Sequence, residues 1–281
     1  MAASAAAARE VVRVLSRHVL PARLQRVRAQ LRFRVADTAL VLENVSDALN
    51  AAACLRTADA LGIHRVLLVN KYVSAKLLAP GQTGVDRGAL KWLSLSHHEH
   101  AQACVDALRA EGFLIAATDL GAGALDAATA AKQTLAMAPP SLMPSVLTPE
   151  TRTSRPRCAV VLGNESRGVS RLMLGAADVR FFLPQAGFVQ SFNVSVACGL
   201  ALSAFLHRTP DFASHALAAH RARAADGAGP AAPVAAAPAD GGGVEVMSDD
   251  EVECVLARTL LRDVPSAAAI LDRAGIRPLD Y

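Results

Sequence analysis

The feature that most constrains the fold is a series of short apolar runs without polar–apolar alternation. They occupy residues 38–45, 64–70, 112–120, 157–165 and 179–185. Continuous apolar strands are typical of a parallel sheet that is buried on both faces, whereas a half-buried antiparallel strand alternates. Because the intervening segments have helical spacing, the chain is predicted to be an α/β protein built on a parallel sheet.

Helices are expected at residues 50–62, 96–112 and 191–207. Gly62 and Gly112 have the position of C-caps. Ser96, with Glu99 three residues later, has the spacing of a capping box. Asn50 is the expected N-cap of the first helix, and Ser191 is the better cap candidate for the third.

The α/β domain is expected at residues 37–208, with helical extensions on both sides. Residues 122–156 are rich in Ala, Pro and Thr and are expected to form a loop or a poorly ordered insertion. Residues 209–247, which contain GAGPAAPVAAAPADGGG, are expected to be a flexible linker. Residues 248–281 are expected to form a small helical extension that begins with a Ser cap and an acidic first turn.

Composition limits the class of protein. With 281 residues, 52% of them hydrophobic, the chain can bury a sizeable core. Its apolar runs are shorter than the roughly 18 residues that a membrane span needs, so no membrane partner is expected. The five cysteines are widely spaced without a CxxC pair, which predicts free thiols in a reducing compartment and no metal site.

The N-terminal segment is strongly basic. It contains eight arginines and a single acid, Glu10, before Asp37. Such a composition is typical of an organelle transit peptide, so residues 1–20 are a candidate address for a mitochondrion or plastid, the protein being cytoplasmic otherwise. Residues 21–36 are expected to form a basic helix, and the net charge of +4 permits a polyanionic partner.

Polar residues gather in three stretches that follow predicted strands. ENVSDALNAAACLRTADALG contains Asn50 and Arg56, VVLGNESRGVS contains Glu165, and LPQAGFVQSFNVSVACG contains Ser191 and Asn193. Ligands of open α/β sheets bind at the carboxyl ends of strands. Taken singly, each stretch also has a structural explanation as a helix cap, an ion-paired arginine or a turn.

Together, the order and spacing of N-x5-R-T-A-x2-L-G, V-L-G-N-E-x2-G-V-S and L-P-x2-G-x-V-Q-S-F-N-V-S-V-A are specific. They resemble the three motifs of the SpoU (TrmH) RNA 2′-O-ribose methyltransferases of the SPOUT superfamily, over about residues 21–208. The segment VQSFNVSVA is most similar to the branch that methylates tRNA. The resemblance implies a SPOUT-type α/β knot, a parallel sheet with a deep trefoil knot in its C-terminal part, and a homodimer that binds S-adenosylmethionine.

The resemblance also implies roles for individual residues. The active-site residues would be Asn50, Arg56, Glu165, Ser191 and Asn193, and the cofactor contacts Thr118, Gly163, Leu183 and Phe192. The arm that binds RNA would consist of Arg23, Arg26, Arg28, Arg32 and Arg34. Phe192 stands where the family usually has Leu, and Ala48 stands where Pro is common.

The expected activity is methyl transfer to a ribose 2′-hydroxyl, on a guanosine in the D-loop of tRNA. Ribosomal RNA is an alternative substrate, because the motifs are shared by both substrate classes. A second alternative is a non-catalytic RNA-binding protein that keeps the fold, although such a protein need not retain all five motif residues. Arg56 is either a general base or a group that binds phosphate and stabilises a developing oxyanion.

Overall fold

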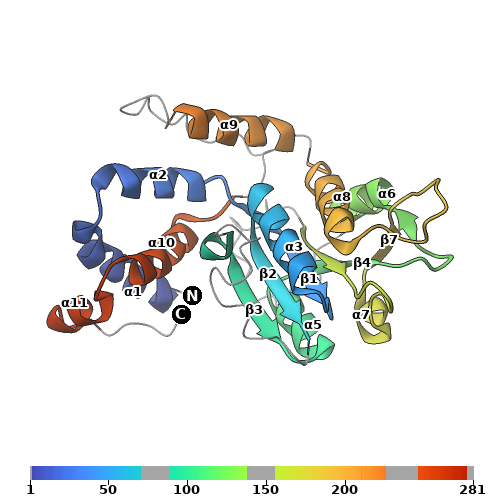
Figure 1. Cartoon of the computed structure of the whole chain (residues 1–281), viewed down its shortest axis with the longest axis horizontal. Coiled ribbons are helices and arrows are strands. Elements are labelled where there is room, and N and C mark those ends of the chain that lie inside the picture. The colour runs from blue at the N-terminus through green and yellow to red at the C-terminus, as the bar shows by residue number, and fades with distance from the viewer. Residues whose placement is uncertain (1, 71–88, 138–155, 210, 226–245, 277–281) are drawn as a thin grey trace. The chain divides into compact units, whose positions relative to one another are not determined.

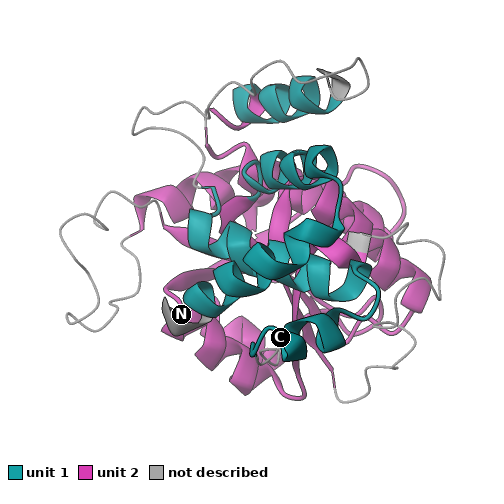
Figure 2. Cartoon of the chain, turned by 90° about the vertical axis from the view of Figure 1, so that its left-hand side faces the viewer, with its two compact units in different colours: residues 1–34, 214–239, 246–281 teal, residues 35–213, 240–245 magenta. Residues whose placement is uncertain are grey.

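The computed structural model describes residues 2–70, 89–137, 156–209, 211–225 and 246–276. The chain divides into two compact units, which Figure 2 colours separately. Unit 1 contains residues 1–34, 214–239 and 246–281, and unit 2 contains residues 35–213 and 240–245. Unit 2 carries the three motif stretches, and unit 1 carries the basic segment.

Unit 2 is built on a seven-stranded sheet in the order β3-β2-β1-β6-β4-β7-β5, in which every neighbouring pair is parallel (Figure 1). The strands are β1 (Val35–Glu43), β2 (Ile63–Val69), β3 (Ser94–His98), β4 (Phe113–Thr118), β5 (Leu125–Asp126), β6 (Arg157–Leu162) and β7 (Val179–Phe182). The predicted α/β class with a parallel sheet is confirmed. The short edge strands β3 and β5 were not predicted.

The sheet is buried on both faces, which explains its continuous apolar strands. Val41 and Ile115 pack in one cluster with Leu108 of α5 (Ala101–Ala110) and Met173 of α7 (Arg171–Ala176). Leu40, the neighbour of Val41, points to the opposite face and is fully buried as well. Helices α3 (Ala48–Ala60), α6 (Ala127–Ala136) and α8 (Val194–Leu206) pack together, and α8 contacts β1 and β6.

The predicted helix at residues 96–112 begins later than expected. Ser96 lies in β3, where it pairs with Leu67 of β2, and α5 begins only at Ala101 with His100 as its N-cap. The predicted capping box of Ser96 and Glu99 is therefore wrong, because strand pairing satisfies the backbone there. The short 3-10 helix η2 (Ala89–Trp92) precedes this strand.

Two predicted caps are also wrong. Asp47 caps α3 by accepting a hydrogen bond from Leu49 N at 2.8 Å, so Asn50 lies inside the helix. Asn193 caps α8 by accepting from Ser195 N at 2.9 Å, in place of Ser191. Asp47 and Asn193 each stand directly before the first turn of their helix and therefore take the cap position. The side chains of Asn50 and Ser191 remain available for other contacts.

Two stretches expected to lack regular structure contain helices. Within 122–156, Ala127–Ala136 forms α6, whose cap Asp126 accepts from the N–H groups of Ala128 and Thr129. Within 209–247, Phe212–Ala225 forms α9. The loop and linker predictions are wrong for these residues, and their remainders at 138–155 and 226–245 lie outside the described residues.

Unit 1 consists of helices from both ends of the chain. They are α1 (Ala2–Leu15), η1 (Ser16–His18), α2 (Pro21–Leu31), α9, α10 (Asp249–Asp263) and α11 (Ala267–Arg273). Helix α1 packs on α10, and Val11, Leu15, Val252 and Leu256 are buried. Ser248 caps α10 in a full capping box with Glu251, which confirms the predicted helix start.

The segment proposed as an organelle address is part of this folded unit. Its apolar side chains Ala8, Val11 and Leu15 are buried, as expected for a helix of the folded protein. The organelle address stays a prediction. Within the described part of the chain, every helix is too short or too polar to cross a bilayer.

All five cysteines are free thiols, and four of them are buried. Burial raises the pKa of the Cys104 thiol to about 12 and that of Cys158 to about 11. These two thiols therefore stay protonated and unreactive at neutral pH. Over the described ranges, no group of three His, Cys, Asp or Glu side chains is placed to hold a metal ion.

A buried arginine just after α8 ties three elements of unit 2 together. The guanidinium of Arg208, whose side chain is 1% exposed, donates to Thr134 Oγ1 at 3.0 Å and to the carbonyl oxygens of Asp37 and Pro156 at 3.2 Å each. It also lies 3.7 Å from the buried Asp37 carboxylate. Arg208 thus joins the end of α8 to β1, α6 and the start of β6.

Replacing Arg208 with Met should destabilise unit 2 by about 3–5 kcal/mol, because the buried Asp37 carboxylate loses its cationic partner and keeps only the hydrogen bond from Thr38. Urea unfolding at neutral pH measures the loss. Arg171→Met, at an exposed position, is the matched control. A loss no larger than that of the control would show that Arg208 does not hold these elements together.

Candidate functional site

The motif residues converge on one edge of the sheet. β1, β6, β4 and β7 are neighbours and parallel, so their carboxyl ends lie side by side. The first motif follows β1, the second follows β6 and the third follows β7. This is the edge at which open α/β sheets bind ligands.

Three predicted active-site residues form a hydrogen-bonded chain. Asn193 Nδ2 donates to Asn50 Oδ1 at 3.1 Å, and Asn50 Nδ2 donates to Glu165 Oε1 at 3.0 Å. Both the oxygen and the nitrogen of the Asn50 amide are therefore engaged in hydrogen bonds. They are available for these bonds because Asp47 is the N-cap of α3. The chain joins residues from all three motifs.

The other two predicted active-site residues, Ser191 and Arg56, take no part in these hydrogen bonds. Ser191 is exposed in the loop before α8, two residues ahead of Asn193. Arg56 is exposed on α3, six residues after Asn50. Both side chains are accessible to a substrate.

The loop that presents Glu165 is tightly closed by backbone contacts. Asn164 and Gly168 exchange two backbone hydrogen bonds, of 3.1 and 2.8 Å. Gly168 has a φ of +66°, and a Cβ on Gly163 would lie 2.2 Å from the carbonyl carbon of Gly168. Glycine is thus required at both positions, because a side chain would strain one and collide at the other.

A buried carboxylate, which was not singled out from the sequence, anchors the same loop. Glu43 is 1% exposed at the end of β1 and accepts from Ser170 N and Ser170 Oγ, each at 2.7 Å. The next residue, Asn44, has a φ of +55° and accepts from Asn164 Nδ2 through its carbonyl at 2.8 Å. The available signal was a lone acid at the end of an apolar strand, since a buried acid needs partners.

The predicted cofactor contacts lie at the ends of adjacent strands. Thr118 ends β4, Gly163 follows β6 and Leu183 follows β7, while Phe192 is half-buried in the loop before α8. The Thr118 hydroxyl donates to Val161 O at 3.2 Å, so its hydrogen is already engaged within the sheet. Residues 184–191 are all exposed, so the loop after β7 is accessible to a ligand.

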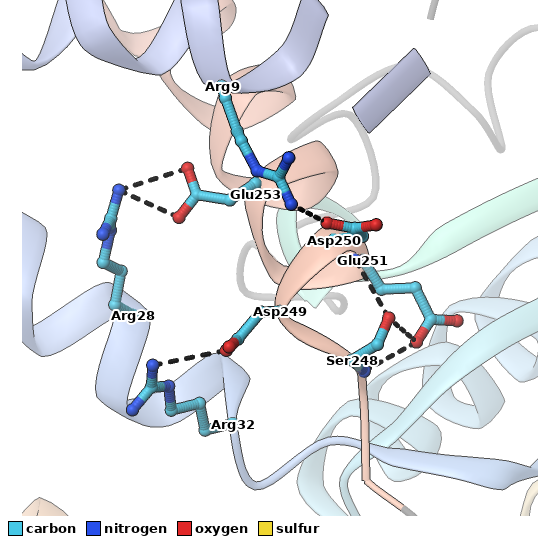
Figure 3. A network of polar contacts seen from close by, with 8 residues as sticks. All are labelled: Arg9, Arg28, Arg32, Ser248, Asp249, Asp250, Glu251 and Glu253. Carbon is cyan, nitrogen blue, oxygen red and sulfur yellow. Dashed lines mark hydrogen bonds and ion pairs between the residues drawn. The ribbon is translucent and has the colours of Figure 1, made fainter. Parts of the chain in front are cut away.

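The predicted RNA-binding arginines lie in unit 1, where several pair with acids of α10. Arg23 lies 2.8 Å from Asp263, Arg28 lies 2.9 Å from Glu253, and Arg32 lies 3.3 Å from Asp249. Figure 3 shows the latter two pairs beside a third between Arg9 and Asp250. Of the remaining two arm residues, Arg26 is exposed and Arg34 is half-buried.

These ion pairs were not predicted, although the sequence contains two segments of opposite charge. The acidic first turn of α10 was assigned only to stabilisation of the helix dipole. The opposite charge is carried by the basic, acid-poor segment before Asp37, about 220 residues away in the chain. The pairing required tertiary structure, because opposite charge alone does not choose which segments meet.

Comparisons with known proteins identify the family of the chain. The sequence matches the model of the SpoU rRNA Methylase family over residues 37–203. A tRNA (guanosine(18)-2'-O)-methyltransferase of Borreliella burgdorferi is 29% identical over 195 residues, which are 69% of this chain and 78% of that protein. A protein of the same name from Thermus thermophilus is 32% identical over 181 residues, 64% of this chain and 80% of that one.

Among solved structures, a TrmH/SpoU tRNA modifying enzyme of A. aeolicus aligns with a TM-score of 0.57 at 24% identity. The alignment covers 87% of this chain and 98% of that chain, and at this identity it shows a shared fold. The family match spans the sheet and all three motif stretches. The chain therefore belongs to the SpoU methylase family, as its three motifs indicated.

Proposed function

We propose that the chain transfers a methyl group from S-adenosylmethionine to a ribose 2′-hydroxyl of RNA, on a guanosine in the D-loop of tRNA. The observation that carries this proposal is the hydrogen-bonded chain of Asn193, Asn50 and Glu165 at the carboxyl edge of the sheet. The relatives named as tRNA (guanosine(18)-2'-O)-methyltransferases support the choice of substrate.

The protein contributes mainly position and charge. When bound, S-adenosylmethionine supplies an electrophilic methyl group on sulfur, and Thr118, Gly163, Leu183 and Phe192 would hold it at the strand ends. The Asn50 amide is fixed from both sides and keeps Glu165 and Asn193 in register beside the ribose. Alignment of two reactants contributes up to about 7–11 kcal/mol in favourable cases.

Arg56 is assigned to the substrate. A guanidinium stays protonated in proteins, so it acts by binding a phosphate and stabilising the negative charge that develops on the 2′-oxygen. The hydroxyl proton would pass to water or to a phosphate oxygen, and the 2′-oxygen would bond to the methyl carbon as the methyl–sulfur bond breaks. Ser191, which is exposed two residues before Asn193, would contact the ribose in this proposal.

Incubation with labelled S-adenosylmethionine should label tRNA at a D-loop guanosine, as ribose-methylation mapping would show. Arg56→Lys keeps the charge but loses the planar fork, so the rate should fall by about 100-fold or more. The S-adenosylmethionine affinity of this variant should stay unchanged in calorimetry.

Label in ribosomal RNA alone would overturn the tRNA assignment. Label in neither RNA would favour a non-catalytic RNA-binding protein. Near-full activity of Arg56→Lys would overturn the role proposed for Arg56, and it would count equally against a general base at this position, since both depend on the guanidinium.

We further propose that the arm Arg23, Arg26, Arg28, Arg32 and Arg34 binds the RNA backbone. The side chains of Arg23, Arg28 and Arg32 stay 58%, 44% and 67% exposed within their ion pairs. A guanidinium has five donors, so one carboxylate leaves donors for a phosphate. The α10 acids then hold the arm in place and partly neutralise it.

RNA affinity, measured by fluorescence anisotropy, should therefore fall steeply with added salt, and the slope should shrink in Arg28→Gln/Arg32→Gln. Asp249→Asn/Glu253→Gln should bind RNA more tightly than wild type. The control is Asp272→Asn on α11, an exposed acid outside these pairs. A flat salt response would remove the arm from the proposal.

We also propose a homodimer that uses one face of α8. Val196 and Leu200, one helical turn apart, are 50% and 45% exposed, and Leu49 on the packed helix α3 is 57% exposed. Apolar residues gathered on neighbouring helices mark an interaction surface. The trefoil knot implied by the motifs stays a prediction.

Sedimentation of the wild-type protein should give twice the chain mass. Val196→Asp/Leu200→Asp should give a monomer with unchanged circular dichroism, because a charge at each position opposes burial of this face. A wild-type protein that sediments as a monomer at micromolar concentration would contradict the proposal.

A further inference from the structure

A surface hollow lined by residues that follow β1 and β6 has no part in the proposed function. It has a volume of about 390 Å³ and is lined by Asn44, Asn164, Arg167, Gly168 and Ser170. These residues follow β1 and β6 on the same edge of the sheet as Asn50 and Glu165. The volume is within the range of small-ligand sites.

The walls of the hollow are held by hydrogen bonds. Asn164 Oδ1 accepts from the N–H groups of Ser166 and Arg167 at 2.9 and 3.1 Å, and Asn164 Nδ2 donates to Asn44 O. On the other side, Ser170 is fixed to the buried carboxylate of Glu43 by two bonds of 2.7 Å. The shape of the hollow is thus formed before a ligand arrives.

The charge of the lining favours an anion. Arg167 is the single ionic side chain among the five lining residues, and it is exposed. The Glu43 carboxylate below the wall already accepts two hydrogen bonds from Ser170, and it is not among the lining residues. Because the Arg167 backbone is fixed by Asn164, its guanidinium extends from an anchored position, which suits the bidentate binding of a phosphate.

We propose that this hollow is a subsite for a backbone phosphate of the RNA, with Arg167 as its charged contact. The inference rests on the proposed function and adds a specific phosphate to it. Arg167 is two residues from Glu165 in the same closed loop, so the bound phosphate belongs to the RNA segment that enters the active site. Glu43 and Ser170 keep the wall of the subsite in place.

The test compares Arg167→Gln with Arg171→Gln, using full-length protein and a tRNA probe in fluorescence anisotropy. Arg171 is also exposed, four residues away and outside the lining, so both variants lose the same charge. Arg167→Gln should raise the Kd for RNA about 10-fold and reduce the salt slope by about one. Arg171→Gln should change both much less, and Arg167→Lys should recover part of the affinity.

Calorimetry of S-adenosylmethionine binding to the same variants shows whether the hollow binds RNA or the cofactor. The expected result is an unchanged cofactor affinity in Arg167→Gln. A loss of cofactor affinity without a loss of RNA affinity would assign the hollow to the cofactor and overturn the proposal.

The remaining outcomes separate the subsite from the proposed function. If the wild-type protein binds and methylates RNA but Arg167→Gln behaves like Arg171→Gln, the subsite alone is wrong. If the wild-type protein neither binds RNA nor transfers methyl to it, both the proposed function and the subsite are wrong.

Discussion

Burial of the parallel sheet on both faces is the constraint on which the rest of unit 2 depends. Val41 and its neighbour Leu40 are both excluded from water, on opposite faces of β1. Strands covered in this way tolerate a polar side chain along their length only where it has partners, as Asp37 has in Arg208, and the polar residues of the three motifs lie beyond the strand ends. Because the strands are parallel, their carboxyl ends meet, and loops that are far apart in sequence share one edge.

At the carboxyl ends of these strands, the helix caps are linked to the hydrogen bonds between Asn193, Asn50 and Glu165. Asp47 caps α3, so the Asn50 amide is available to Asn193 and Glu165. Asn193 serves in both ways, since its Oδ1 caps α8 while its Nδ2 binds Asn50. The start of α8 and the hydrogen-bonded chain therefore both depend on the Asn193 side chain.

Glu43 shows how the sheet also supports the loop of the second motif. A carboxylate buried at the end of β1 is tolerated because Ser170 donates twice to it. That pairing fixes the far end of the loop, while the turn between Asn164 and Gly168 fixes its near end. Glu165 and Arg167 are thus presented from a loop held on both sides. In unit 1, ion pairs with acids of α10 likewise hold the side chains of Arg28 and Arg32.

The sequence by itself determined the α/β class and the approximate strand positions, because apolar continuity is a local pattern. Motif spacing selected Asn50, Glu165 and Asn193, and the structure joins these three side chains in one hydrogen-bonded chain. It also predicted the Ser248 cap of α10, a signal contained within one turn of the chain. Only tertiary structure decided that Ser96 lies in an edge strand, that Arg28 meets Glu253, and that Glu43 holds Ser170. Each of these depends on partners from distant parts of the chain, and local propensity carries no information about which distant segments meet.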